Sequence, residues 1–423
     1  MSGLKRQSEY GSPRVALVAA AANQGGAHVA ALRLYRGLRA ARCDATYVTG
    51  LVAPGQRDVG PPSTRVEEAR WKARARIGRA IARGFDRQAM GMQSLNILPS
   101  GLDWRLSCRR FQLVHLHWVN NELLSIPEIG RIGAPMVWTL HDMWAFCGTE
   151  HYMSDPSAYL GVVGTRPSAG PSQLARWNWE RKRRWWAGVR PILVAPSNWL
   201  ADLVRQSRLL GHCRVEVVPY GLDLKRFSPA AAAGDSGKRA LRVVFGAAGG
   251  TQDHRKGFDL LIPAVRRLAA LLPDSCLELL VFGEAATPSF DPLPASVSLS
   301  SAGVIDSEEA MSNLLASADI FVAPSRQDNL PNTVLEATAC GVPTVAFRVG
   351  GMLDMIEHQV SGYLARPYEV EDLAAGMAWA LHDSSRLWGL KQAARAKAER
   401  EFGSDRQADR MLAIYDEAIR ESR

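Results

Sequence analysis

The chain has 423 residues, of which 47% are hydrophobic and 22% charged, and its formal net charge is +9. This composition provides material for about two to three globular domains and excludes disordered, fibrous and mini-protein classes. No apolar run reaches the ~18 residues of a membrane span, so neither a spanning helix nor a cleaved signal peptide is expected. The cysteines are too widely spaced for zinc or redox motifs, which fits a reducing cytoplasm.

The first half of the chain alternates short apolar runs with amphipathic segments. The runs are nearly continuous and rich in β-branched residues, as parallel strands buried on both faces are. They cover 14–20, 46–50, 111–118, 135–140, 191–197 and 214–221. Helical patterns at 27–41 and 198–209 lie between them. This order predicts a doubly wound, Rossmann-like α/β domain over residues 1–227.

A small, flexible linker over 228–240 is followed by a second βα pattern over 241–400. Its strands are expected at 241–247, 277–283, 297–303, 319–325 and 343–349, and its helices at 257–272, 307–317, 331–340 and 351–358. A last helix over 401–423 is expected to return to the first domain. Two such sheets would face a shared ligand cleft, which suits a transferase, an epimerase or a two-lobed binding protein equally well.

The segment 323–347 reads as a strand, a polar turn, a helix and another strand. Pro331 suits a first helical turn, whose free amide groups would favour a phosphate. Asp328 before this helix and Glu336 within it could bind two sets of sugar hydroxyls. Alternatively, Asp328 caps the helix and Glu336 is solvated.

A second candidate site is the glycine-rich turn that follows strand 241–247. Gly246, Gly249 and Gly250 allow close backbone approach, and Arg255 with Lys256 can balance a diphosphate. Two solvated basic residues are the alternative, which the positive end of the following helix disfavours.

The first domain has two candidate positions at strand ends. His141 follows strand 135–140, whereas His115, His117 and His151 are expected to be structural. Gly25 and Gly26 precede the first helix, where they would admit a ligand or simply form a tight turn.

Together these segments resemble the retaining family-4 glycosyltransferases of the GT-B fold, especially the bacterial surface-polysaccharide branch. That family carries two glutamates separated by seven residues, and Asp328 and Glu336 occupy these positions. The family usually has an arginine six residues before its lysine, where this chain has Gly250.

The resemblance implies a role for each matched residue. Asp328 would bind the donor hexose, Glu336 the ribose, Lys256 and Arg255 the diphosphate, and His141 would meet the transferred sugar. The implied catalytic residues are His141, Lys256 and Asp328, and the implied donor site adds Gly25, Gly26, Arg255, Ile305, Asn329, Leu330, Asn332 and Glu336.

The implied reaction moves a hexose from a UDP- or GDP-linked sugar to a saccharide acceptor expected to be lipid-linked. Because no DxD motif or metal-binding spacing occurs, no metal cofactor is expected. A nucleotide-sugar 2-epimerase shares the two-domain shape and is the first alternative. A nucleic-acid-binding protein is the second.

Basic residues concentrate in two windows, 65–110 and 176–190, which together carry +12, so the rest of the chain is close to −3. The first window holds a helical stripe, with Ile77, Ile81 and Phe85 expected on the other side. The stripe consists of Lys72, Arg76, Arg79, Arg83 and Arg87. The second window mixes arginines with the tryptophans of segment 177–186, a composition suited to anionic lipid headgroups. We therefore expect peripheral attachment to the inner face of the plasma membrane, with a solvated helix face or nucleic-acid binding as alternatives.

Overall fold

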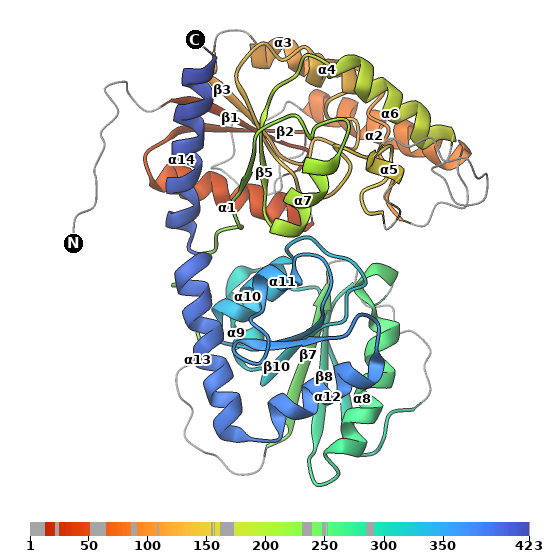
Figure 1. Cartoon of the computed structure of the whole chain (residues 1–423), viewed down its shortest axis with the longest axis vertical. Helices are drawn as coiled ribbons and strands as arrows, with labels where there is room; N and C mark the ends of the chain where they lie inside the picture. The colour runs from red at the N-terminus through yellow and green to blue at the C-terminus, as the bar shows by residue number, and fades with distance from the viewer. Residues whose placement is uncertain are drawn as a thin grey trace. The chain divides into compact units, whose positions relative to one another are not determined.

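The computed structural model describes residues 13–21, 25–50, 65–85, 91–107, 110–153, 155, 157–160, 173–230, 239–247, 251, 253–284 and 292–422. The chain divides into two compact units (Figure 1). The first contains the chain up to Val218 and the segment from Gln407 onward, and the second runs from Pro219 to Arg406. Each unit contains one six-stranded sheet, and all neighbouring strands pair in parallel. The predicted pair of parallel α/β sheets is therefore confirmed.

The first sheet has the strand order β2-β1-β3-β4-β5-β6. Its strands are β1 (Arg14–Ala19), β2 (Asp44–Thr49), β3 (Leu113–Leu116), β4 (Met136–Thr139), β5 (Ile192–Ala195) and β6 (Val215–Val217). All residues of β3, β4 and β5 are buried, which explains their unbroken apolar character. The apolar runs extend beyond these strands because the loops at their carboxyl ends are buried as well.

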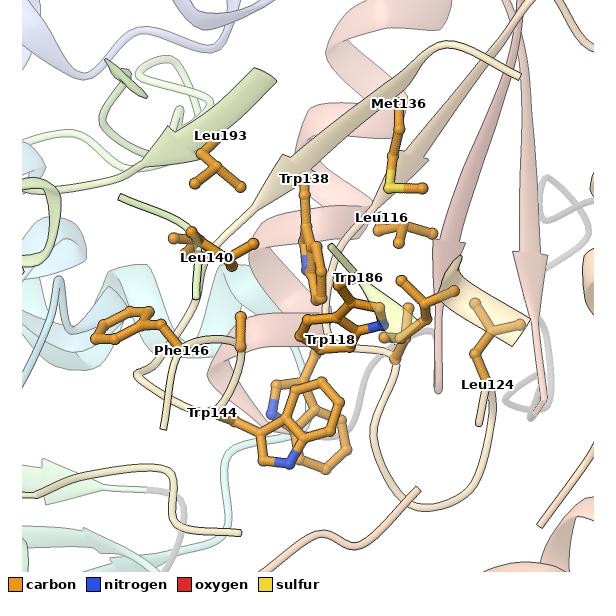
Figure 2. Packing of buried hydrophobic residues seen from close by; sticks show 14 of the residues in the cluster. Leu116, Trp118, Leu124, Met136, Trp138, Leu140, Trp144, Phe146, Trp186 and Leu193 are labelled. Carbon is orange, nitrogen blue, oxygen red and sulfur yellow. The ribbon is translucent and has the colours of Figure 1, made fainter. Parts of the chain in front are cut away.

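The helices of the first unit lie on both sides of this sheet. They are α1 (Gly26–Ala40), α2 (Arg65–Phe85), α3 (Leu102–Ser107), α4 (Ile126–Gly130), α5 (Ser157–Leu160), α6 (Gln173–Trp185), α7 (Asn198–Gln206) and α14 (Ser404–Glu421). One hydrophobic cluster joins the sheet to α1 and to the buried face of α14, including Met411 and Tyr415. The other contains a group of aromatic side chains, and Figure 2 shows Trp138, Trp144 and Trp186 gathered at its centre.

The second sheet has the strand order β12-β11-β10-β7-β8-β9. Its strands are β7 (Leu241–Ala247), β8 (Leu277–Gly283), β9 (Val297–Gly303), β10 (Ile320–Ala323), β11 (Thr344–Phe347) and β12 (Gly362–Ala365). The helical segments are the 3-10 helix η2 (His254–Lys256), α8 (Phe258–Leu271), α9 (Glu308–Ala316), α10 (Asn332–Ala339), α11 (Met352–Met355), α12 (Val370–Leu381) and α13 (Ser384–Glu401). Strand β12 was not predicted, because its four residues contain one glycine and no β-branched side chain.

The two basic windows form helices whose burial differs in part from the expectation. On α2 the buried face includes Trp71, Ala75 and Ala82, whereas Ile77 and Phe85 are exposed. Ile77 and Phe85, expected on the side of the helix away from the basic stripe, do not belong to this buried face. Among the described residues, no helix is both long and apolar enough to cross a membrane.

The segment 177–186, expected to face lipid as a whole, is divided between surface and core. Trp177 and Trp185 are exposed, but Lys182 and Trp186 are buried. The Nζ atom of Lys182 donates to the carbonyl oxygens of Trp144, Cys147 and Gly148, and it lies 3.8 Å from the ring centre of Trp144. This part of the expectation is wrong, because the side chain of Lys182 anchors the loop after β4.

Candidate functional site

In the second unit, the segment around η2 packs on the loop between β10 and α10. Gly257 has a φ of +72°, and a Cβ atom there would lie 1.9 Å from the carbonyl oxygen of Pro324. The backbone N–H of Arg326 also donates to the carbonyl oxygen of Arg255 at 2.8 Å. This close backbone contact places Arg255 and Lys256 beside the loop that contains Asp328.

Asp328 is 4% exposed and is held by two cations. Its Oδ2 lies 2.5 Å from Nζ of Lys256, and its Oδ1 lies 3.2 Å from Nη1 of Arg255. Burial alone would raise the pKa of Asp328, but Lys256 and Arg255 outweigh burial and hold this pKa below its usual range. The structure therefore places two of the predicted site residues, Lys256 and Arg255, against the ionised carboxylate of a third, Asp328.

The backbone around Asp328 is fixed by a second close approach. Gly350 has a φ of +55°, and a Cβ atom there would lie 2.0 Å from the carbonyl oxygen of Asp328. The N–H of Gly351 donates to that same oxygen at 3.0 Å. The glycine pair after β11 thus positions Asp328, a role that the sequence reasoning did not identify.

The other predicted donor residues of the second unit lie on the same loop and helix, with one exception. Asn329 and Leu330 are buried next to Asp328, and Asn332 is the first residue of α10. Glu336 is 5% exposed, so its alternative as a solvated helix residue is wrong. The N-cap of α10 is Pro331, so Asp328 does not cap this helix.

The remaining predicted residues of this unit do not belong to the loop and helix that contain Asp328 and Glu336. Ile305 lies in the loop between β9 and α9 and is half-buried. Gly249 and Gly250 fall outside the described residues.

In the first unit, buried histidines lie on strand β3 and directly after the strands β3 and β4. Nδ1 of His117, after β3, lies 3.1 Å from Nε2 of His141, after β4. Burial, and next the neighbouring imidazole rings, lower the pKa of both far below the ordinary histidine value. Both rings are therefore neutral at neutral pH.

His115 and His151 hold the surroundings of this pair in place. His115 contacts the hydroxyls of Tyr415 at 2.7 Å and Thr139 at 2.8 Å. His151 lies 2.6 Å from Asp142, whose carboxylate also accepts from the indole N–H of Trp118. His117, in contrast, touches His141 directly, and its position at the end of the strand next to that of His141 was the signal that sequence reasoning missed.

The first helix begins at the two predicted glycines. Gly25 is the N-cap of α1 and Gly26 is its first residue, and both are exposed. His28, two residues further, is buried and packs edge to face against Trp118, with the ring centres 5.1 Å apart.

Within the described part of the chain, no cluster of three or more His, Cys, Asp or Glu residues is placed to hold a metal ion.

Solved structures define the class of fold. The chain is similar to sucrose-phosphate synthase from Thermosynechococcus elongatus, with a TM-score of 0.64 and 17% identity over 96% of this chain and 99% of that chain. It is also similar to Anabaena HepE in complex with UDP and glucose, with a TM-score of 0.63 and 14% identity over 96% of this chain and 99% of that chain. These likenesses identify the two-sheet architecture as a GT-B fold.

Sequence comparisons define the family. Residues 24–226 match the model described as Glycosyltransferase Family 4, and residues 242–383 match Glycosyl transferases group 1. A D-inositol 3-phosphate glycosyltransferase of Saccharomonospora viridis is 35% identical over 73% of this chain and 70% of its own length. One of the same name from Segniliparus rotundus is 28% identical over 74% of this chain and 67% of its own length. The chain belongs to the family-4, group-1 glycosyltransferases.

Proposed function

We propose that this protein transfers a hexose from a nucleoside-diphosphate sugar to a hydroxyl of an acceptor, with retention of the anomeric configuration. The observation that supports it best is the buried carboxylate of Asp328 between Lys256 and Arg255. Asp253 also contacts Arg255 at 3.2 Å, so two cations face two carboxylates in this group. A donor diphosphate would therefore find cations already placed, and the Asp328 carboxylate would accept hydrogen bonds from hexose hydroxyls.

In the proposed reaction, the bond between the anomeric carbon and the diphosphate oxygen breaks as the acceptor oxygen attacks from the same face. The proton of the acceptor hydroxyl passes to the leaving phosphate. Lys256 and Arg255 stabilise the charge that grows on the leaving group, and no metal ion takes part. Glu336 binds the ribose, and neutral His141 contacts the transferred sugar.

For the acceptor, we propose a lipid-linked saccharide of surface-polysaccharide synthesis, used at the cytoplasmic face of the membrane. Support comes from the exposed side of α2, where Lys72, Arg76 and Arg79 lie with the exposed apolar side chains of Ile77 and Phe85. Arg83 is exposed as well, and Arg87 falls outside the described residues. Basic and apolar side chains on one helix favour the headgroup region of an anionic membrane.

A second candidate acceptor is an inositol phosphate. It is favoured by the name D-inositol 3-phosphate glycosyltransferase, which several curated relatives share. The two acceptors differ in lipid attachment, so a single assay can separate them.

The test is a matrix of donors and acceptors in which release of the nucleoside diphosphate is measured. UDP- and GDP-linked hexoses are combined with D-inositol 3-phosphate, with a lipid-linked saccharide extract, or with no acceptor. We expect release that depends on one donor and one acceptor, and a chelator should leave the rate unchanged. An isomerised nucleotide sugar formed without acceptor would instead support the epimerase.

A further inference from the structure

A small cavity lies in the first unit at the carboxyl ends of β3 and β4, where open parallel sheets bind their ligands. It has room for about one water molecule. Its lining includes His117, Trp118 and Asn120 after β3, together with His141 and Asp142 after β4. The cavity thus borders the histidine that the proposed function places against the transferred sugar.

Two residues of this lining each have a buried polar side-chain atom that lacks a hydrogen-bond partner within the part of the chain that the structure describes. These atoms are Nε2 of His117 and Oδ1 of Asn120, and the two residues are 3% and 2% exposed. A buried polar atom without a partner costs ~1–3 kcal/mol, and native proteins contain few of them. We therefore expect a group from outside the chain to complete this site.

The chemistry of the two atoms restricts what that group can be. The carbonyl oxygen of Asn120 only accepts hydrogen bonds, so the group must donate one. The buried ring of His117 is neutral and offers no positive charge to an anion. An ionised phosphate or carboxylate therefore does not fit, whereas a neutral hydroxyl, which both donates and accepts, fits both atoms.

We propose that His117 and Asn120 bind one hydroxyl of a substrate polyol, either on the donor hexose or on the acceptor. A cavity of this size holds a single such group, so both atoms would contact the same hydroxyl. This inference rests on the proposed function, since it assumes that a sugar substrate reaches the ends of β3 and β4.

The proposal also fixes the protonation of His141. A hydroxyl has one proton, and it goes to Oδ1 of Asn120, so Nε2 of His117 must carry a proton and donate. Nδ1 of His117 is then unprotonated and accepts from Nε2 of His141, which lies 3.1 Å away. The ring of His141 is therefore protonated at Nε2. In this arrangement His117 and Asn120 contact the substrate hydroxyl itself, and His117 also orients His141.

The first test measures equilibrium binding to the wild type and to Asn120→Leu, which keeps the volume but removes the acceptor oxygen. The donor arm uses UDP, UDP-glucose and each of its monodeoxy analogues. The acceptor arm uses D-inositol 3-phosphate and its monodeoxy analogues in the presence of UDP. We expect one analogue to bind the wild type about tenfold more weakly than its parent compound, as for a hydrogen bond worth ~1.4 kcal/mol. In Asn120→Leu this difference should become smaller, because only the contact with Nε2 of His117 remains.

The control is Thr139→Val, because the hydroxyl of Thr139 lines the same cavity but already contacts His115 at 2.8 Å. This variant should keep the discrimination between parent and deoxy compound. If the wild type binds no UDP- or GDP-linked hexose, the proposed function itself fails. The other adverse outcome is that the wild type and Asn120→Leu discriminate equally between a bound parent compound and each of its deoxy analogues. In that case water alone fills the cavity and the inference is overturned.

The second test reads the protonation state directly. Nitrogen NMR of histidine-labelled protein with the bound polyol should show His117 and His141 each protonated at Nε2. Protonation of His117 at Nδ1 instead would contradict the proposed hydroxyl contact, whatever the binding data show.

Discussion

Lys256 makes the shorter of the two ion pairs with Asp328, at 2.5 Å. If it also stabilises the leaving diphosphate, its interaction must strengthen in the transition state. We predict that Lys256→Ala lowers kcat by roughly 100-fold or more, with a smaller effect on the Kd of the nucleotide sugar.

Lys225→Ala is the matched control for this change, because Lys225 is an exposed lysine of the same unit. It should leave both constants unchanged. An equal loss in kcat and in affinity for Lys256→Ala would mean that Lys256 only positions the bound donor.

Glu336 is a buried carboxylate on the short helix α10, and we expect it to bind the donor ribose. Glu336→Gln keeps the shape but removes the charge from hydrogen bonds worth ~1.5–3 kcal/mol each. Titration calorimetry should therefore show nucleotide binding weakened by about 10-fold to 150-fold, with little change in thermal unfolding. Glu309→Gln, on the exposed side of α9, should change neither quantity, and unaltered affinity in Glu336→Gln would refute the assignment.

Helix α6 is held to the loop after β4 by Lys182, and burial lowers the pKa of Lys182 to about 7. The unfolded chain keeps this proton up to its ordinary pKa of 10.5, so between these two values the unfolded state binds more protons. The free energy of unfolding should therefore rise with pH across this window, by at most ~1.4 kcal/mol per pH unit from this group.

Urea unfolding of the wild type and of Lys182→Met, at several pH values between neutral and alkaline, measures this effect. The difference between the two proteins should grow in favour of the wild type as the pH rises. Lys225→Met, which removes an exposed lysine, should follow the wild type. A pH-independent difference between the wild type and Lys182→Met would show that Lys182 keeps its proton in the folded state.

At the level of elements, the sequence predicted every strand of both sheets except β12, because buried parallel strands are continuous apolar runs. It could not predict which residues at the end of α6 are buried, since Lys182 and the following Trp186 are of the same types as their exposed neighbours Arg183 and Trp185. Burial of a lysine depends on carbonyl groups from a distant loop, and no local pattern encodes these.

The same limit applies to the candidate site. Strand-end position identified Asp328 and His141 as candidates, and the glycine-rich turn before a helix identified Lys256. The contact of His117 with His141, in contrast, depends on the pairing of β3 with β4. Strand order in a sheet is a property of the whole fold, so sequence spacing alone could not show that these two rings meet.

For the whole molecule, membrane attachment is proposed for α2 in the first unit and nucleotide-sugar binding for the second unit. The two should therefore be separable by mutation. Each basic residue near an anionic leaflet contributes about 1 kcal/mol, so replacing Lys72, Arg76, Arg79 and Arg83 with Gln should release the protein from anionic vesicles. Binding of UDP-glucose should be unchanged, and raised salt should mimic the substitution. Vesicle flotation and calorimetry measure the two outcomes.

The control removes four exposed basic residues of the second unit instead, namely Lys225, Arg267, Arg366 and Arg406. It lowers the net charge equally and should leave vesicle binding intact. Equal release by both variants would indicate a general charge effect rather than a docking face on α2.

The packing of α14 has a consequence for how the protein is made. Tyr415 is fully buried in the hydrophobic cluster that joins α14 to the sheet of the first unit, and its hydroxyl contacts His115, 300 residues earlier in the chain. A ribosome therefore completes the whole second unit before it delivers the last part of the first one. During synthesis the sheet of the first unit therefore keeps an uncovered apolar face until α14 has been made. A stop codon shortly before α14 would destabilise the half of the protein that was translated first.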